Sequence, residues 1–194
     1  MIAALYVDPR GPYVGRPDVD AWHLPRDALD YDGPWPIVAH PPCTGYGQLR
    51  ASVAADADRD SCAPRAVEQV RRWGGVLEHP RGSRLWPLAD LPRPGAAADE
   101  HGGYTVSVRQ CDWGHKCTKP TWLYVVGVPR DIVVAEIAKR GTGTPTHMIG
   151  GSNRGWRGRL GGPRLLASNK RMNILTPEAF AAWLMSLAAR VSHA

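Results

Sequence analysis

The chain lacks any long hydrophobic run. None of its apolar stretches approaches the ~20 residues that a transmembrane helix needs, although hydrophobic residues make up 43% of the 194 residues. The N-terminus also lacks the basic start and the cleavage pattern of a secretory signal. The sequence therefore predicts a cytoplasmic globular protein without a membrane partner, and it leaves the oligomeric state open.

Cysteine is scarce, with thiols only at Cys43, Cys62, Cys111 and Cys117. In a cytoplasmic protein such thiols are free or bind metal, because disulfide frameworks belong to oxidising compartments. Glycine (21) and proline (18) make up about a fifth of the chain, below the ~25–30% that marks low complexity. We therefore expect a single loop-rich domain over residues 1–194.

Acidic residues are missing from the segment 139–171, which holds eight Lys and Arg residues. Subtracting these eight from the net charge of +6 leaves −2 for the rest of the chain. Such cations release counterions from a phosphate backbone, and an aromatic side chain can stack on a base. The segment predicts DNA contact, with a solvated basic loop as the alternative; the candidates are Arg154, Trp156, Arg157, Arg159, Lys170 and Arg171.

Short apolar runs separated by prolines and glycines indicate an α/β domain. The runs 2–7, 37–39 and 76–77 predict buried strands, and 19–24 predicts a further short strand. Alternating patterns predict two paired strands at 104–109 and 121–128, and the loop 45–60 is a candidate lid. Helices are predicted at 63–73 and after Thr176, where the second helix has the apolar stripe Phe180, Trp183, Leu184, Leu187 and Val191.

The tripeptide Pro41-Pro42-Cys43 follows a predicted strand. The prolines remove two N–H donors, so the chain must leave the sheet and present the thiol. Cys43 is thus a candidate nucleophile, with a buried apolar cysteine as the alternative. Glu78 follows the next predicted strand, and parallel β-α-β topology places it at the same sheet edge as Cys43.

Other polar residues allow more than one interpretation. Cys111, His115 and Cys117 could share a zinc ion with Cys62 or His101, but the spacing matches no standard zinc motif, so we expect no metal. Lys116 and Lys119 could contact phosphate or remain solvated. His40, beside the prolines, could orient the loop, hold the Cys43 thiolate, or have a purely structural role.

Taken in order, Pro41-Pro42-Cys43, Glu78 and Gln110 resemble the cytosine carbon-5 DNA methyltransferase family, and most closely its small bacteriophage-type relatives. The stretch 162–168, with Arg171 and Thr176-Pro177, is similar to the segment that leads these enzymes into their last helix. The resemblance implies a Rossmann-like open, mostly parallel sheet with a shortened N-terminal half. It also implies that Cys43 and Glu78 are catalytic, with Pro42 and His40 beside them, and that Gln110 contacts DNA.

The chemistry implied by this resemblance explains the residue types. Carbon 5 of cytosine becomes nucleophilic only after a thiolate adds to carbon 6. Cys43 would form this adduct, while Glu78 would hydrogen-bond the ring nitrogen and the exocyclic amine. That role requires a carboxyl group able to share or donate a proton near neutral pH. The target base must be flipped out of a duplex or single-stranded.

The sequence departs from the family where the methyl donor should bind. The family holds S-adenosylmethionine with a Gly-rich turn after the first strand, and residues 7–13 contain no such turn. Asp8, Asp20 and Asp27 are the remaining candidates for donor contacts, although Asp in loops also forms turns. We therefore expect either S-adenosylmethionine at a degenerate site or a folate one-carbon donor. A pyrimidine hydroxymethylating enzyme and an inactive basic DNA-binding protein are the alternative functions.

Overall fold

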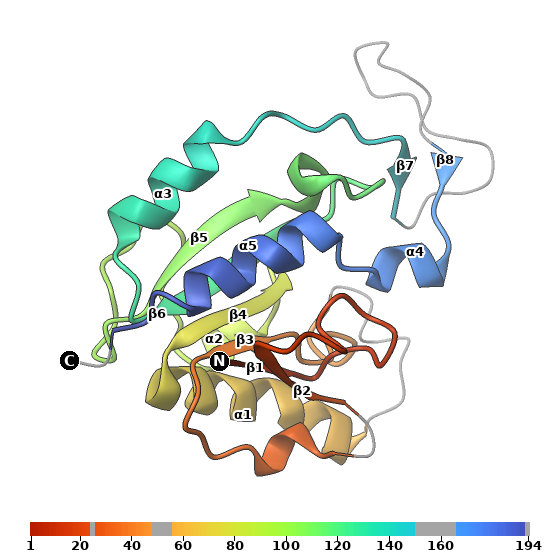
Figure 1. Cartoon of the computed structure of the whole chain (residues 1–194). Helices are drawn as coiled ribbons and strands as arrows, with labels where there is room; N and C mark the ends of the chain where they lie inside the picture. The colour runs from red at the N-terminus through yellow and green to blue at the C-terminus, as the bar shows by residue number, and fades with distance from the viewer. Residues whose placement is uncertain (24–25, 48–55, 150–165, 193–194) are drawn as a thin grey trace.

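The computed structural model describes residues 1–23, 26–47, 56–149 and 166–192. A six-stranded sheet forms its centre (Figure 1). In spatial order the strands are β2 (Val19–Trp22), β1 (Ile2–Leu5), β3 (Ile37–Ala39), β4 (Gly75–Pro80), β6 (Pro120–Val126) and β5 (Tyr104–Arg109).

The sheet is mixed. β1 to β4 pair only in parallel, while β6 lies antiparallel to both β4 and β5. Five strands therefore share one direction and β6 runs against them. The α/β class and the pairing of the two alternating strands are confirmed, and the segment between β1 and β2 consists of turns without a helix.

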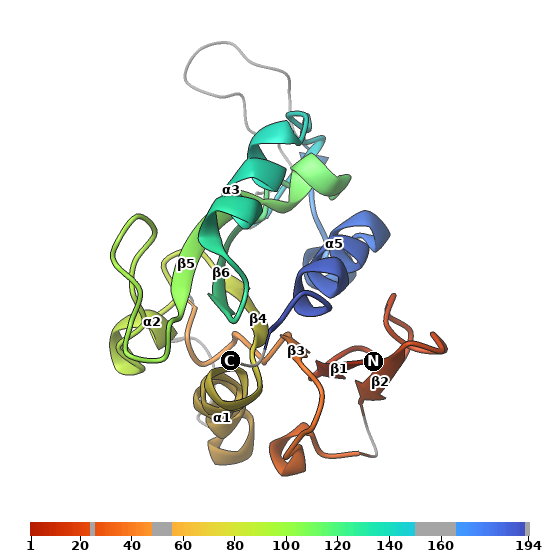
Figure 2. The same cartoon turned by 60° about the vertical axis from the view of Figure 1, so that its left-hand side comes forward.

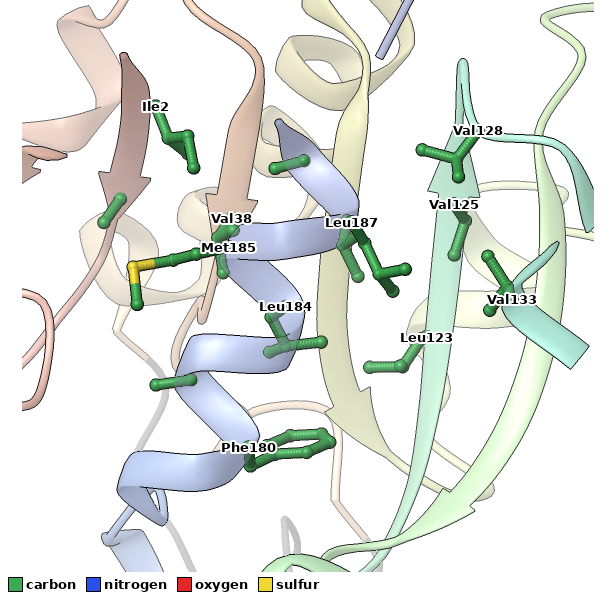
Figure 3. Close-up of a cluster of buried hydrophobic side chains, with 14 of the residues drawn as sticks. Ile2, Val38, Leu123, Val125, Val128, Val133, Phe180, Leu184, Met185 and Leu187 are labelled. Atoms are coloured by element: carbon green, nitrogen blue, oxygen red, sulfur yellow. The ribbon is translucent and has the colours of Figure 1, made fainter. Parts of the chain in front are cut away.

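Helices cover both faces of the sheet (Figure 2). Because side chains alternate along a strand, Ala3 and Leu5 pack toward α1 (Ala57–Trp73), whereas Ile2 and Ala4 pack toward α5 (Glu178–Ala188). The α5 core side chains belong to one buried cluster with Val38 of β3 and Leu123 of β6 (Figure 3). Phe180, Leu184 and Leu187 of the predicted stripe are buried on α5, whereas Trp183 is partly buried and Val191 lies beyond the end of the helix. Pro177 rather than Thr176 occupies the N-cap position.

Helix α1 begins at Ala57, six residues before the predicted start at position 63. The Asp56 side chain accepts a hydrogen bond from the Arg59 N–H, and Asp58 and Asp60 lie in the first turn, where the helix dipole favours negative charge. Part of the predicted lid loop is therefore helix. Residues 48–55 of that loop lie outside the described residues.

Several elements were not predicted from the sequence. The longest is α3 (Arg130–Lys139), which packs beside β5 and fully buries only Val133, so its apolar periodicity is weak. The others are α2 (Leu85–Leu88), α4 (Lys170–Ile174), the 3-10 helices η1 (Ala28–Asp30) and η3 (Gln110–Trp113), and the strands β7 (His147–Met148) and β8 (Leu166–Ala167). Among the described helices, none is long and apolar enough to cross a membrane.

Gly75 sets the position of β4 against β3. Its φ of +118° is a backbone conformation that side chains rarely allow, and a Cβ there would collide with the Ile37 backbone. Gly75 pairs with Ile37 and so fixes the register in which Leu77 pairs with Ala39. That register determines where Glu78 lies relative to the loop that follows β3.

Candidate active site

A cavity of about 660 Å³ lies at the carboxyl ends of the parallel strands. Its walls come from the segments after β1 and β3, from β4, from Lys119, and from residues 171–178. β1 lies between β2 and β3, so the order of the strands reverses at β1. Open α/β sheets bind ligands at the carboxyl ends of the strands where the strand order reverses in this way.

Cys43 lines this cavity and is exposed, so the thiol is presented and not part of the core. Its carbonyl oxygen accepts hydrogen bonds from the N–H groups of Tyr46 and Gly47, which closes a tight turn directly after the prolines. Desolvation by the surrounding protein and the negative charge of Glu78 both raise the pKa of the Cys43 thiol, while the positive charge of Lys119 lowers it. Because the net shift is upward, the thiol needs a nearby base or positive charge to form a thiolate at neutral pH.

Glu78 lies within β4, which continues to Pro80 instead of ending before the carboxylate as the sequence predicted. The strand is longer because β6 pairs with it as far as Pro80. Alternation then sends Glu78 and His79 to opposite faces, and only Glu78 lines the cavity. His79 is fully buried, with Nδ1 2.8 Å from Ser83 Oγ, and burial lowers its pKa to about 4.

Both carboxylate oxygens of Glu78 have partners. Gln110 Nε2 donates to Oε1 over 2.9 Å, with Thr121 Oγ1 3.3 Å from the same oxygen. Oε2 lies 3.1 Å from His40 Nδ1. Burial acts to raise the pKa of Glu78, but the His40 hydrogen bond and the charge of Lys119 outweigh it and lower the pKa to about 2. A carboxyl group with this pKa is ionised near neutral pH, and the expected role of Glu78 in sharing or donating a proton to a bound base stays a prediction.

Tyr13 is a site residue that the sequence did not reveal. Its hydroxyl lies 2.7 Å from His40 Nε2, and the ring is fully buried against the imidazole. Nothing marks it in the sequence, because it is one tyrosine in a turn rich in glycine and proline. His40 thus bridges Tyr13 and Glu78.

Lys119 places a positive charge beside Cys43 and Glu78. Its Nζ donates to the Leu175 carbonyl oxygen over 2.9 Å, and burial lowers its pKa while the charge of Glu78 raises it. Its backbone has a φ of +40°, which is uncommon for a residue other than glycine. Arg171 also lines the cavity and is exposed.

The three aspartates predicted to bind a donor do not line one common site. Asp8 lines the cavity, and its carboxylate accepts from the Arg10 N–H in a turn. Asp20 accepts from Arg26 at 2.6 Å and from the Trp22 indole, while Asp27 caps η1. Asp20 and Asp27 are not among the residues that line the cavity.

Gln110 is corrected from a DNA contact to an internal support. Its side chain is fully buried, because η3 turns the amide inward to meet Glu78 and Thr121. Lys116 is exposed, while Lys170 begins α4. The predicted contacts Arg154, Trp156, Arg157 and Arg159 lie outside the described residues.

The cysteine cluster does not assemble a metal site. His115 Nδ1 accepts from the Cys117 N–H, and its Nε2 lies 3.0 Å from the Met172 carbonyl oxygen, so both ring nitrogens are used. The suggested fourth ligands are elsewhere, with Cys62 on α1 and His101 in the loop before β5. In the part of the chain that the structure describes, no group of three His, Cys, Asp or Glu side chains could hold a metal ion.

Comparison with protein-family models, with curated proteins and with solved structures finds no match to this chain. A function has to be inferred from the residues of the cavity.

Proposed function

We propose that this protein transfers a one-carbon group to carbon 5 of cytosine in DNA through a covalent adduct with Cys43. The observation that carries the proposal is the shared cavity: an exposed thiol from the β3 loop and a largely buried carboxylate from β4, whose pKa is lowered to about 2, line the same 660 Å³ space. The volume lies within the range of roughly 300–1,000 Å³ typical of small-molecule sites, which suits a flipped pyrimidine.

The reaction follows from the chemistry of the ring. The Cys43 sulfur forms a bond to carbon 6, and the electrons released make carbon 5 a nucleophile toward the donor. A base then removes the hydrogen of carbon 5, and the thiolate leaves as the ring regains its double bond. Lys119 stabilises the thiolate, since its positive charge lowers the pKa of Cys43.

The net charge of the chain, +6, supports a nucleic-acid substrate. The cavity wall itself is balanced in charge, because the cations Arg10, Lys119 and Arg171 line it together with the carboxylates of Asp8, Glu78 and Glu178. Exposed Ile174 and Leu175, which follow Arg171, also line the cavity. Apolar side chains beside cations suit a base and its phosphate together.

The identity of the donor distinguishes two versions of the proposal. The turn between β1 and β2 has no Gly-rich pattern and no helix whose N-terminus could face the donor. This favours a donor other than S-adenosylmethionine, and a folate one-carbon unit would use the same activated carbon 5. Saturable thermal stabilisation by S-adenosylmethionine would instead favour the methyltransferase version.

Trapping with DNA that contains 5-fluorocytosine tests the proposal. Once carbon 5 has accepted the one-carbon group, fluorine cannot leave as a cation, so the Cys43 adduct persists and appears as a covalent protein–DNA band. Each donor is supplied in turn, and Cys43→Ser should abolish the band. Cys62→Ser, which changes a thiol outside the cavity, is the matched control and should leave the band unchanged.

If no donor yields a covalent complex, the protein is better described as an inactive DNA-binding protein. Mass spectrometry of nucleosides from unmodified DNA after incubation identifies the product, because methyl and hydroxymethyl groups add different masses to cytosine.

A further inference from the structure

Most arginine side chains of this protein are engaged within the fold. In the described ranges, nearly all of them form an ion pair with an Asp or Glu carboxylate, and Arg130 and Arg140 lie over the rings of Tyr104 and Trp113. The structure describes all 18 Asp and Glu residues of the chain. Among the described residues, the arginines whose guanidinium group has no such partner are Arg81, Arg84, Arg93 and Arg171.

Two of these arginines, Arg81 and Arg84, belong to the turn that follows β4 at the carboxyl end of the sheet. The Arg81 N–H donates to the Pro120 carbonyl oxygen over 3.0 Å, and the Arg84 N–H donates to the Tyr46 carbonyl oxygen over 3.1 Å. The backbone of the turn is therefore fixed on both sides, while both arginine side chains are exposed.

This turn lies at the rim of the cavity. Pro80, directly before Arg81, lines the cavity. Tyr46, which accepts the hydrogen bond from Arg84, itself donates from its N–H to the Cys43 carbonyl oxygen over 3.0 Å. The two arginines are thus joined by backbone hydrogen bonds and chain connectivity to the loop of the thiol and to the cavity wall, on the side of β4.

The distribution of charge separates this side of the rim from the others. The cavity wall is balanced in charge, so it offers little net attraction to a phosphate. On the β1 side, Arg10 pairs with Asp8 and Arg26 pairs with Asp20. The unpaired guanidinium groups are on the β4 side, and a guanidinium has the N–H geometry that binds phosphate oxygens.

We propose that Arg81 and Arg84 bind the phosphate backbone of the DNA strand that carries the target cytosine, where this strand passes the β4 side of the cavity. The inference rests on the proposed function, which supplies DNA as the partner. The base that enters the cavity is flipped out or single-stranded, and its phosphates stay outside. Phosphate contacts fix the position of a strand without reading its sequence, so the two arginines are positioning residues that bring the base toward Cys43.

Fluorescence anisotropy over a salt series tests the site, with a labelled single-stranded oligonucleotide that contains one cytosine. In the double variant Arg81→Gln/Arg84→Gln, the slope of log affinity against log salt should decrease by roughly 1.4, because each lost phosphate contact on a single strand accounts for about 0.7. The loss of affinity should be about equal for different flanking sequences. Circular dichroism should show an unchanged fold, since both side chains are exposed and unpaired.

Two single variants serve as controls. Arg93→Gln removes an exposed, unpaired cation whose neighbour Pro94 lines a different pocket with Thr105 of β5, and it should keep the wild-type slope. Arg10→Gln removes a cation of the β1 side that already pairs with Asp8, so the slope should change much less than in the double variant.

The covalent adduct with 5-fluorocytosine DNA separates this inference from the proposed function. The double variant should still form the adduct, but it should need more DNA to reach half of the maximal rate, because Cys43 and Glu78 are intact. A wild-type salt slope in the double variant, or a decrease only in Arg10→Gln, would overturn the phosphate site and leave the proposed function standing if the adduct forms. A decreased slope in the double variant with no adduct from any donor would support the phosphate site and overturn one-carbon transfer. Wild-type binding that does not depend on salt would overturn both.

Discussion

Gln110 Nε2 donates a hydrogen bond to Oε1 of Glu78 across 2.9 Å and joins the two halves of the sheet at the cavity. Gln110 follows β5 in the antiparallel part, whereas Glu78 belongs to β4 in the parallel part. The carboxylate is therefore oriented from both sides, by Gln110 and by His40. Its position and its charge depend on strands that are distant in the sequence.

The reactivity of Cys43 should respond in opposite directions to its two charged neighbours. Glu78→Gln removes a negative charge that raises the pKa of the thiol, so alkylation by iodoacetamide at pH 7 should become faster. Lys119→Met removes the charge that lowers this pKa, so alkylation should become slower. Mass spectrometry of the Cys43 peptide gives both rates, with Cys62, which lies outside the cavity, as the internal reference. A change of the same sign in both variants would contradict the electrostatic explanation.

Stability should fall on acidification in two steps that belong to neighbouring residues of β4. His79 has a folded pKa of about 4 against an ordinary 6.5, so its contribution is complete above pH 6.5 and is lost between pH 6.5 and 4. Glu78 has a folded pKa of about 2 against 4.5, so its contribution is complete above pH 4.5 and is lost as pH falls toward 2. Each step should lower the free energy of unfolding by an amount on the order of 3 kcal/mol.

Urea unfolding from pH 7 to pH 2 measures the free energy of unfolding across both steps. In His79→Gln the free energy of unfolding should no longer change between pH 6.5 and 4, while the step below pH 4.5 remains. In Glu78→Gln the step below pH 4.5 should disappear. If His79→Gln leaves the upper step unchanged, another group carries it.

Replacing Gly75 should disrupt the register that positions Glu78. Gly75→Ala adds a Cβ that collides with the Ile37 backbone at a φ of +118°, and we expect a loss on the order of 3 kcal/mol in the free energy of unfolding. Gly82→Ala is the matched control, since its φ is +76° and no atom lies within 4 Å of the added Cβ. It should cost about 1 kcal/mol, from backbone strain alone. Equal losses in the two variants would show that the collision is relieved by movement of β3.

Arg171 should contribute to DNA binding through phosphate. Arg171→Gln should weaken DNA binding about equally for different sequences, and the slope of log affinity against log salt should decrease by about 1. Fluorescence anisotropy over a salt series measures this slope. Arg93→Gln, an exposed cation that does not line the cavity, is the control and should leave the slope unchanged. A wild-type affinity that does not depend on salt would remove DNA as the partner.

Local patterns in the sequence determined much of the fold. The runs at 2–7 and 37–39 are short and uniformly apolar, which is typical of strands buried on both faces, and both form parallel strands. The α5 stripe repeats at helical spacing, so its buried face was readable from one segment alone. α3 and the first turns of α1 escaped prediction because their buried residues are few or their side chains are polar.

For the site, the sequence by itself determined that Cys43 leaves the sheet after two prolines and that Glu78 comes to the same edge, because chain connectivity and strand direction require both. Only the tertiary structure decided the charge of Glu78, the burial of Gln110 and the presence of Tyr13. The physical reason is that these properties depend on hydrogen bonds between residues 27 to 38 positions apart. No local pattern of apolar and polar residues encodes which distant side chains face one another across a cavity.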